Sequence, residues 1–241
     1  MSKNAALASP PADHVRVPAA IDSGASAPAQ PAGDGDGAAL APLDRAIDLM
    51  LALALLAFFW PLMLGLALLV RFAGNGPILF KQQRVGHGGK LFFCYKFRTM
   101  RVDAEEVLAA VLQKSAALRE EWERTHKLRN DPRLARFGAF LRRTSLDELP
   151  QLFNVIRGDM SIVGPRPITP GEVVRYGRYI HSYHAVRPGL TGLWQVSGRS
   201  QTTYRRRVAC DVAYARGRSP WCNIQIIART VPAVLLSRGA R

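Results

Sequence analysis

Two adjacent carboxylates, Asp147 and Glu148, lie among arginines in the stretch from residue 141 to 167. A carboxylate can act as a covalent nucleophile toward phosphorus, forming an acyl phosphate and dividing one transfer into two easier steps. Because Mg²⁺ commonly binds one or two carboxylates together with substrate phosphates, the same pair predicts a Mg²⁺ site. Arg142 and Arg166 could clamp phosphate oxygens through paired hydrogen bonds. The pattern indicates phosphoryl transfer, with Asp147 as nucleophile and Glu148 as a positioning or metal-binding group.

The residues around this pair predict a short helix over 147–156, a turn at Gly158, an extended run and a rigid Gly-Pro-Arg-Pro exit. A helix start would favour two anions, since its unpaired N–H groups carry the positive end of the dipole. The alternative interpretation is structural, because Ser145 and Glu148 fit a capping box. Pro150 argues against that register, since a proline deeper in a helix removes a hydrogen bond. A cap at the first carboxylate would place the proline in the first turn, where it costs nothing.

The segment RRTSLDELPQLFNVIRGDMSIVGPRP strongly resembles the bacterial sugar transferase family, the monotopic polyprenyl-phosphate phosphoglycosyl transferases. FKQQRVG and YKFRTMRVDAE, earlier in the chain, match the same family, and the resemblance runs from about residue 42 to the C-terminus. It implies transfer of a sugar 1-phosphate from a nucleotide sugar, with UDP as the expected nucleotide, to undecaprenyl phosphate. The nucleoside monophosphate would be released. This reaction would initiate exopolysaccharide, capsule, O-antigen or glycan assembly.

The resemblance implies further binding residues outside the central stretch. Two cations beside the predicted hairpin would face phosphate, and the Gly/Pro-rich loop over 186–199 is implicated in nucleotide-sugar binding. A purely structural loop is the alternative for residues 186–199. The additional candidates for phosphate or substrate binding are Lys96, Arg98, Arg187, Thr191 and Arg199.

Residues 49–70 form an apolar run of membrane length, without a charge between Asp48 and Arg71. A helix of this length could cross the ~30 Å hydrocarbon core, so a single-pass anchor is one interpretation. Pro61 can break the helix near its middle, and the family implies a re-entrant helix–break–helix that enters and leaves on one face. Trp60 departs from the family, whose members often carry a small or polar residue before the proline. Both topologies place the catalytic part on the cytoplasmic face of the bacterial inner membrane, because basic residues follow the run.

The chain carries 33 basic and 18 acidic residues among 241, a formal charge of +15. A basic body suits a polyanion, so the main alternative function is a membrane-tethered module that binds anionic lipid or nucleic acid without catalysis. A structural partner for polysaccharide machinery is a third interpretation. An acidic pair among the arginines argues against both, and nucleic acid is not expected as a partner. The three cysteines lack CxxC spacing and indicate free thiols, and the sequence is compatible with a homo-oligomer.

The expected fold class is α/β and rich in helix: a monotopic membrane protein with a short hairpin and surface amphipathic helices. Residues 1–41 lack large apolar side chains and predict a disordered tail. Residues 42–73 would form the membrane re-entrant helix, and residues 74–241 the cytoplasmic catalytic domain. The predicted elements of that domain are hairpin strands at 78–80 and 91–97, and helices at about 103–127, 172–185 and 204–234.

Overall fold

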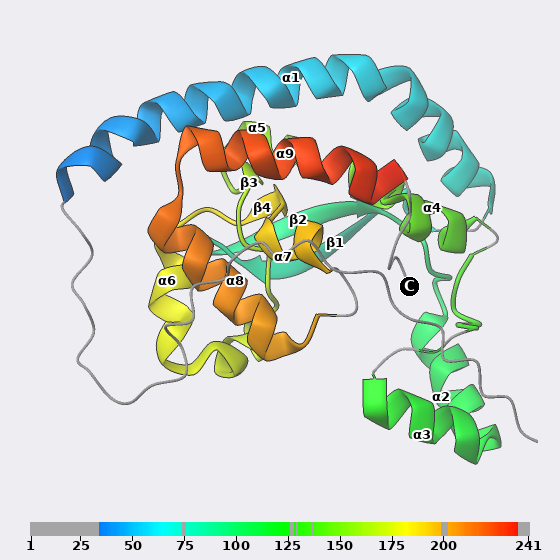
Figure 1. The fold of residues 1–241 in the computed structure, drawn as a ribbon. Coiled ribbons are helices and arrows are strands. Elements are labelled where there is room, and N and C mark those ends of the chain that lie inside the picture. Colours follow the sequence, from blue (N-terminus) through cyan, green and yellow to red (C-terminus); the bar gives the residue numbers. More distant parts are fainter. Residues whose placement is uncertain are drawn as a thin grey trace, which may run out of the picture.

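The computed structural model describes residues 34–73, 76–125, 128, 130–135, 137–198 and 202–235. Within this part helices surround two small sheets, and the longest helix runs along the top of the molecule (Figure 1). The elements marked η are 3₁₀ helices. In chain order the elements are α1 (Asp34–Ala73), β1 (Leu79–Val85), η1 (His87–Gly89), β2 (Leu91–Phe97), α2 (Ala104–Lys114), α3 (Ala116–Thr125), α4 (Gly138–Thr144), η2 (Leu146–Glu148), α5 (Gln151–Arg157), β3 (Ser161–Val163), η3 (Pro170–Tyr179), α6 (Ile180–His184), β4 (Gly189–Thr191), α7 (Leu193–Ser197), α8 (Tyr204–Gly217) and α9 (Pro220–Leu235).

Helix α1 is one continuous element of 40 residues with Pro61 inside it. The expected separation into two helices is therefore absent, although α1 arches and its C-terminal part turns down (Figure 1). Proline removes one backbone donor and crowds the preceding turn, which bends a helix without necessarily ending it. Its segment from Pro42 to Phe72 is long and apolar enough to cross a membrane. The helix begins before the boundary predicted at residue 42, while residues 1–33 of the predicted tail lie outside the described part.

Polar contacts fasten the N-terminal half of α1 to the body. Arg45 donates from Nη1 to the carbonyl oxygen of Val155 at 2.6 Å and from Nη2 to that of Ile156 at 2.9 Å. These carbonyls belong to the last turn of α5, where helix carbonyls lack partners within the helix. Asp48 accepts hydrogen bonds from the hydroxyl of Ser161 at 3.0 Å and from the following backbone N–H at 2.9 Å. This half of the helix is therefore bound to α5 and β3.

Apolar contacts fasten the other half of α1. Met63, Leu66 and Val70 are buried in one cluster with Phe97 of β2 and Leu141 of α4. At about 25 cal/mol per Å² of buried apolar surface, each such side chain contributes roughly 1.5–3 kcal/mol. Both halves of α1 consequently rest on the same globular body.

The predicted hairpin is confirmed. Strands β1 and β2 pair antiparallel from Leu79 opposite Phe97 to Val85 opposite Leu91, so β1 extends beyond the predicted residues 78–80. The second sheet, β3 paired in parallel with β4, was predicted only as an extended run around β3. Gly189 permits the close approach there, because a Cβ at this position would overlap the backbone of Gly164. Three-residue strands are too short to show alternation, which explains why β4 was missed.

Two predicted helices differ from the structure. The helix expected over 103–127 is interrupted at Ser115, whose φ of −135° and ψ of 113° are extended, so α2 and α3 are separate. The Ser115 hydroxyl accepts a hydrogen bond from the N–H of Leu118 at 3.3 Å and thereby starts α3, a typical serine role. The helix expected over 172–185 begins as the 3₁₀ helix η3. The closing helices are confirmed as α8 and α9.

Candidate active site

Asp147 and Glu148 lie in η2, a single 3₁₀ turn between α4 and α5. The prediction that Asp147 starts an α-helix is therefore wrong, because α5 begins at Gln151 with Pro150 as its N-cap. Without an N–H, proline cannot donate a helical bond back across this turn. The preceding turn closes instead through Glu148 N–H to Ser145 carbonyl, at 3.1 Å. Ser145 itself is left-handed, with φ of 58°, and its side chain makes no capping hydrogen bond.

Glu148 is held by two cations. Lys96 Nζ lies 2.6 Å and Arg166 Nη2 3.0 Å from the same oxygen, Oε1. Burial opposes ionisation of this carboxyl, but the charges of Arg166 and Lys96 outweigh burial and lower its pKa below the ordinary value. Glu148 is accordingly an anchored anion that fixes two cations, both of them distant from it in the sequence.

Asp147 differs sharply from its neighbour. It is 7% exposed and makes no hydrogen bond or ion pair with any residue in the described part. Burial, followed by the charge of Glu148, raises the pKa of Asp147 to about 6, against the opposing charges of Lys96 and Arg142. At neutral pH this carboxylate is mostly ionised, yet its oxygens are not engaged by the protein. Those are the properties of a group available to react or to bind a ligand.

Arg142 approaches the pair from the last turn of α4. Its Nε donates to Thr99 Oγ1 at 2.9 Å, and Thr99 is buried just after β2. This bond uses one of the five N–H donors and orients the guanidinium plane. Burial lowers the pKa of Arg142, and the charge of Asp147 opposes that shift, which places the two groups in electrostatic contact. Thr99 was not predicted, because nothing in its local sequence indicates a partner 43 residues away.

Asn154 is the second positioning residue that sequence reasoning missed. It is fully buried in α5, where its Nδ2 donates to the Phe93 carbonyl oxygen at 2.8 Å. Its Oδ1 accepts from the N–H of Tyr95 at 3.1 Å. These bonds tie α5 to the strand that carries Lys96, and so hold the two sides of the Glu148 contact together. A single amide inside the apolar run LFNVI was the available signal, since a buried amide needs partners.

The structure thus brings together five predicted residues, Lys96, Arg142, Asp147, Glu148 and Arg166, which we call the carboxylate cluster. The other predicted binding residues lie elsewhere. Arg187 is exposed and donates from Nε to the Gly158 carbonyl oxygen at 3.2 Å. Thr191 is buried, with its hydroxyl 2.8 Å from that of Thr230 in α9. Arg199 lies outside the described residues, and Arg98 lines a separate pocket.

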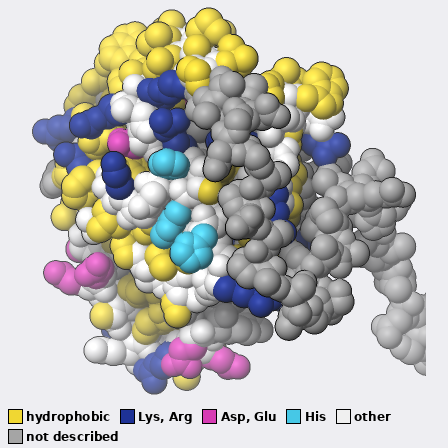
Figure 2. Space-filling model, turned by 90° about the vertical axis from the view of Figure 1, so that its left-hand side faces the viewer, with side chains coloured by type: hydrophobic (Ala, Val, Ile, Leu, Met, Phe, Trp, Pro, Cys, Tyr) yellow, Lys and Arg dark blue, Asp and Glu magenta, His cyan; other side chains and the backbone are white. Residues whose placement is uncertain are grey.

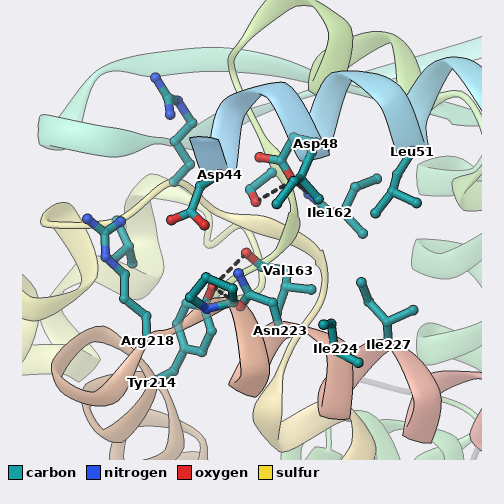
Figure 3. A pocket seen from close by; sticks show the side chains of 15 residues that line it. Asp44, Asp48, Leu51, Ile162, Val163, Tyr214, Arg218, Asn223, Ile224 and Ile227 are labelled. Atoms are coloured by element: carbon teal, nitrogen blue, oxygen red, sulfur yellow. Dashed lines mark hydrogen bonds between the residues drawn. The ribbon is translucent and has the colours of Figure 1, made fainter. Parts of the chain in front are cut away.

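A cavity of about 150 Å³ lies between α1, β3 and α9, and Arg187 is among the residues that line it. Figure 3 shows Asp44 and Asp48 of α1 on one side, and Tyr214 of α8, Arg218 just after α8 and residues of α9 on the opposite side. The Tyr214 hydroxyl lies 3.0 Å from the Val163 carbonyl oxygen. No member of the carboxylate cluster lines this cavity.

Comparison with known proteins identifies the family. The family described as "Bacterial sugar transferase" matches residues 40–237. "Exopolysaccharide production protein ExoY" of Rhizobium meliloti (strain 1021) is 46% identical over 196 residues, which cover 81% of this chain and 87% of that relative. "Undecaprenyl-phosphate galactose phosphotransferase" of Salmonella typhimurium (strain LT2) is 47% identical over 198 residues, covering 82% of this chain and 41% of the relative.

A third relative, "UDP-glucose:undecaprenyl-phosphate glucose-1-phosphate transferase" of Xanthomonas campestris pv. campestris, is 42% identical over 201 residues, 80% of this chain and 39% of its own length. The chain therefore spans most of the Rhizobium relative and less than half of the other two. The matched region contains the whole carboxylate cluster. With this coverage and identity, the chain belongs to the bacterial sugar transferase family.

Proposed function

We propose that this protein transfers a sugar 1-phosphate from a nucleotide sugar, with UDP as the nucleotide, to undecaprenyl phosphate, releasing the nucleoside monophosphate. The reaction would be the initiating step of exopolysaccharide or related glycan assembly. The observation that carries the proposal is the unengaged Asp147 beside an anchored Glu148. The names of the Salmonella and Xanthomonas relatives describe the same type of transfer, with galactose and glucose as their sugars.

Asp147 acts as the nucleophile in this proposal. A carboxylate oxygen attacks the sugar-bearing phosphorus, and the bond from that phosphorus to the nucleoside monophosphate breaks, which leaves an acyl phosphate on Asp147. An oxygen of undecaprenyl phosphate then attacks the same phosphorus. The bond between phosphorus and the Asp147 carboxylate oxygen breaks, the carboxylate is restored, and a lipid-linked diphosphate sugar is formed. Arg142 stabilises the phosphoryl oxygens with donors not used by Thr99.

Glu148 has a positioning role in this mechanism. Because its Oε1 holds both Lys96 and Arg166, it fixes two cations beside the reacting phosphates. It also raises the pKa of Asp147, after burial the largest such effect. Lys96 and Arg166 are predicted to bind phosphate, and each also forms an ion pair with Glu148. The ion pair restricts the directions in which their other N–H groups can donate to a phosphate.

The carboxylate cluster also fits the predicted Mg²⁺ ion. Among the described residues no group of three or more His, Cys, Asp or Glu side chains could hold a metal by itself. Mg²⁺ does not need one, because it is commonly bound by one or two carboxylates, water and substrate phosphates. Asp147 and the second oxygen of Glu148 are the groups that would hold it. When bound, Mg²⁺ would neutralise charge on the diphosphate of the donor.

The membrane arrangement proposed here is re-entrant and monotopic, with the catalytic part on the cytoplasmic face. In its support, both halves of α1 pack on one body, whereas a spanning helix would carry one half away from it. Figure 2 shows hydrophobic side chains gathered along the top of the molecule, where α1 runs. The exposed large apolar residues of α1 are Leu43, Met50, Leu53, Phe58, Trp60, Leu62, Leu64, Leu68 and Phe72.

The test uses the full chain in membranes that contain undecaprenyl phosphate. A panel of nucleotide sugars is supplied one at a time, and release of the nucleoside monophosphate and of lipid-linked sugar is measured. We expect one or a few donors to give both products in equal amounts. An Asp147→Asn protein, present at the same level in the membranes, serves as the control for other transferases. If no donor gives release above that control, the proposed function is wrong.

A further inference from the structure

A second and larger cavity, of about 390 Å³, lies at the C-terminal end of α1. We call it the α1-end pocket. Most of its wall is apolar and comes from α1, α4 and the segment that follows β2. It shares no residue with the cavity of Figure 3. The residues that carry the argument are Leu69, Gly76, Arg98, Phe137 and Leu141.

Arg98 is the unusual member of this wall. Its Nη1 is buried and has no hydrogen-bond partner in the described part of the chain. Leaving a charged donor buried and unpaired is costly, so the protein gains by offering it a partner from outside. Arg101, on the same wall, behaves differently, because two of its nitrogens already bind Asp103 at 2.9 and 2.7 Å. The wall of the pocket therefore includes a guanidinium group whose Nη1 has no partner among the described residues and lies against Gly76.

The α1-end pocket adjoins the carboxylate cluster through two pairs of chain neighbours. Arg98 precedes Thr99, which holds Arg142, and Leu141 precedes Arg142 itself. The same two segments thus form a wall of the pocket and one side of the active site. An anion bound at Arg98 would lie beside the active site, at the end of the apolar helix α1.

We propose that the α1-end pocket binds the acceptor lipid, with its monophosphate at Arg98 and the first isoprene units along Leu69 and Phe137. This inference rests on the proposed function and names the binding site of one of its two substrates. A guanidinium suits the phosphate. The apolar wall suits the hydrocarbon chain, whose remaining length can continue into the membrane beside α1. Phosphatidic acid carries the same chemistry, a monophosphate on hydrocarbon, and is the alternative occupant to be distinguished.

The main experiment separates acceptor binding from donor binding. The full-length Arg98→Gln protein is reconstituted in phosphatidylcholine vesicles, and KM is measured for undecaprenyl phosphate and for the nucleotide sugar. We expect KM for the acceptor to rise at least tenfold, with KM for the donor within twofold of wild type. Arg119→Gln, at an exposed residue of helix α3, removes the same charge and is the matched control. An acceptor KM within twofold of wild type, or equal rises for both substrates, would overturn the proposal.

Gly76→Ala tests the same site without removing a charge. A Cβ at residue 76 would overlap Arg98 Nη1, so the guanidinium must move. We expect the same selective rise in acceptor KM, and this variant decides the matter if Arg98→Gln does not fold. A normal acceptor KM in a folded Gly76→Ala protein would count against the site.

The hydrocarbon part is tested with Phe137→Ser. We expect a larger rise in KM for undecaprenyl phosphate than for farnesyl phosphate, because the shorter chain has less contact to lose. Added phosphatidic acid should inhibit the wild-type protein only weakly. Inhibition at concentrations equal to the acceptor KM, abolished by Arg98→Gln, would instead identify a general lipid-phosphate site. Absence of any monophosphate release from wild-type protein would contradict the proposed function and not the pocket alone.

Discussion

The carboxylate cluster and the loop over residues 186–199 look alike in sequence but differ in the structure. Both combine arginines with Gly/Pro turns. In the cluster, Glu148 forms ion pairs with two cations, and the Asp147 carboxylate has no partner among the described residues. In the loop, Arg187 meets a backbone carbonyl, Thr191 meets another hydroxyl, and the chain forms the strand β4. An arginine near a turn therefore indicates a catalytic site only when it also lies close to a carboxylate in the fold.

The largest effect expected from this comparison is that of Asp147→Asn. The amide cannot form the acyl phosphate, so transfer should fall at least about 1,000-fold, as is typical when a nucleophile is removed. Rapid quenching with donor alone should trap a phosphorylated Asp147 in the wild-type protein and none in the variant. Wild-type turnover by Asp147→Asn would remove the covalent role and, with it, the main contrast between the two regions.

The second effect concerns the arginines of the two regions. Lysine at residue 142 or 166 keeps the charge but cannot make two parallel bonds, so each replacement should cost on the order of 1.5–3 kcal/mol in kcat/KM. Arg187→Lys should cost less, because its observed contact is one bond to a carbonyl oxygen. Steady-state kinetics of the three variants give the order. If Arg187→Lys is the most damaging, the loop binds substrate more strongly than its contacts indicate.

These contrasts also show how far the sequence could be interpreted. The reactive pair and its cations were predictable, because phosphoryl transfer needs those side-chain types and the motif supplies them together. The partner of each cation was not, since Lys96 meets Glu148 across 52 residues. Thr99 and Asn154 were missed for the same reason, because their partners are a distant guanidinium and the backbone of β2. The hairpin was predictable because two short apolar runs flank a Gly-rich turn, whereas the start of α5 after Pro150 depended on one missing N–H.

A third, smaller effect is a change in pH dependence. Because the nucleophile must be ionised, kcat/KM of the wild-type protein should decline as the pH falls through about 6, the pKa of Asp147. Glu148→Gln removes a neighbouring negative charge and frees two cations, and both changes lower that pKa. The acidic limb of the profile should therefore move to lower pH, while activity at neutral pH weakens because Lys96 and Arg166 lose their anchor. A limb that moves to higher pH would contradict the charges inferred here.

The smallest effect is expected in the loop, from Thr191→Val. Thr230 Oγ1 already donates its proton to the Ile226 carbonyl oxygen at 2.7 Å, so Thr191 is the donor in the 2.8 Å contact between the two hydroxyls. Valine removes that donor and keeps a similar shape, while Thr230 retains its other bond. The free energy of unfolding should decrease by about 0.5–1.5 kcal/mol, seen as a fall in Tm of roughly 1–6 °C. In this interpretation KM for the nucleotide sugar stays within about twofold of wild type. A tenfold rise in that KM without a change in Tm would instead support the substrate-binding role predicted for Thr191, and the loop would then join the carboxylate cluster as part of the active site.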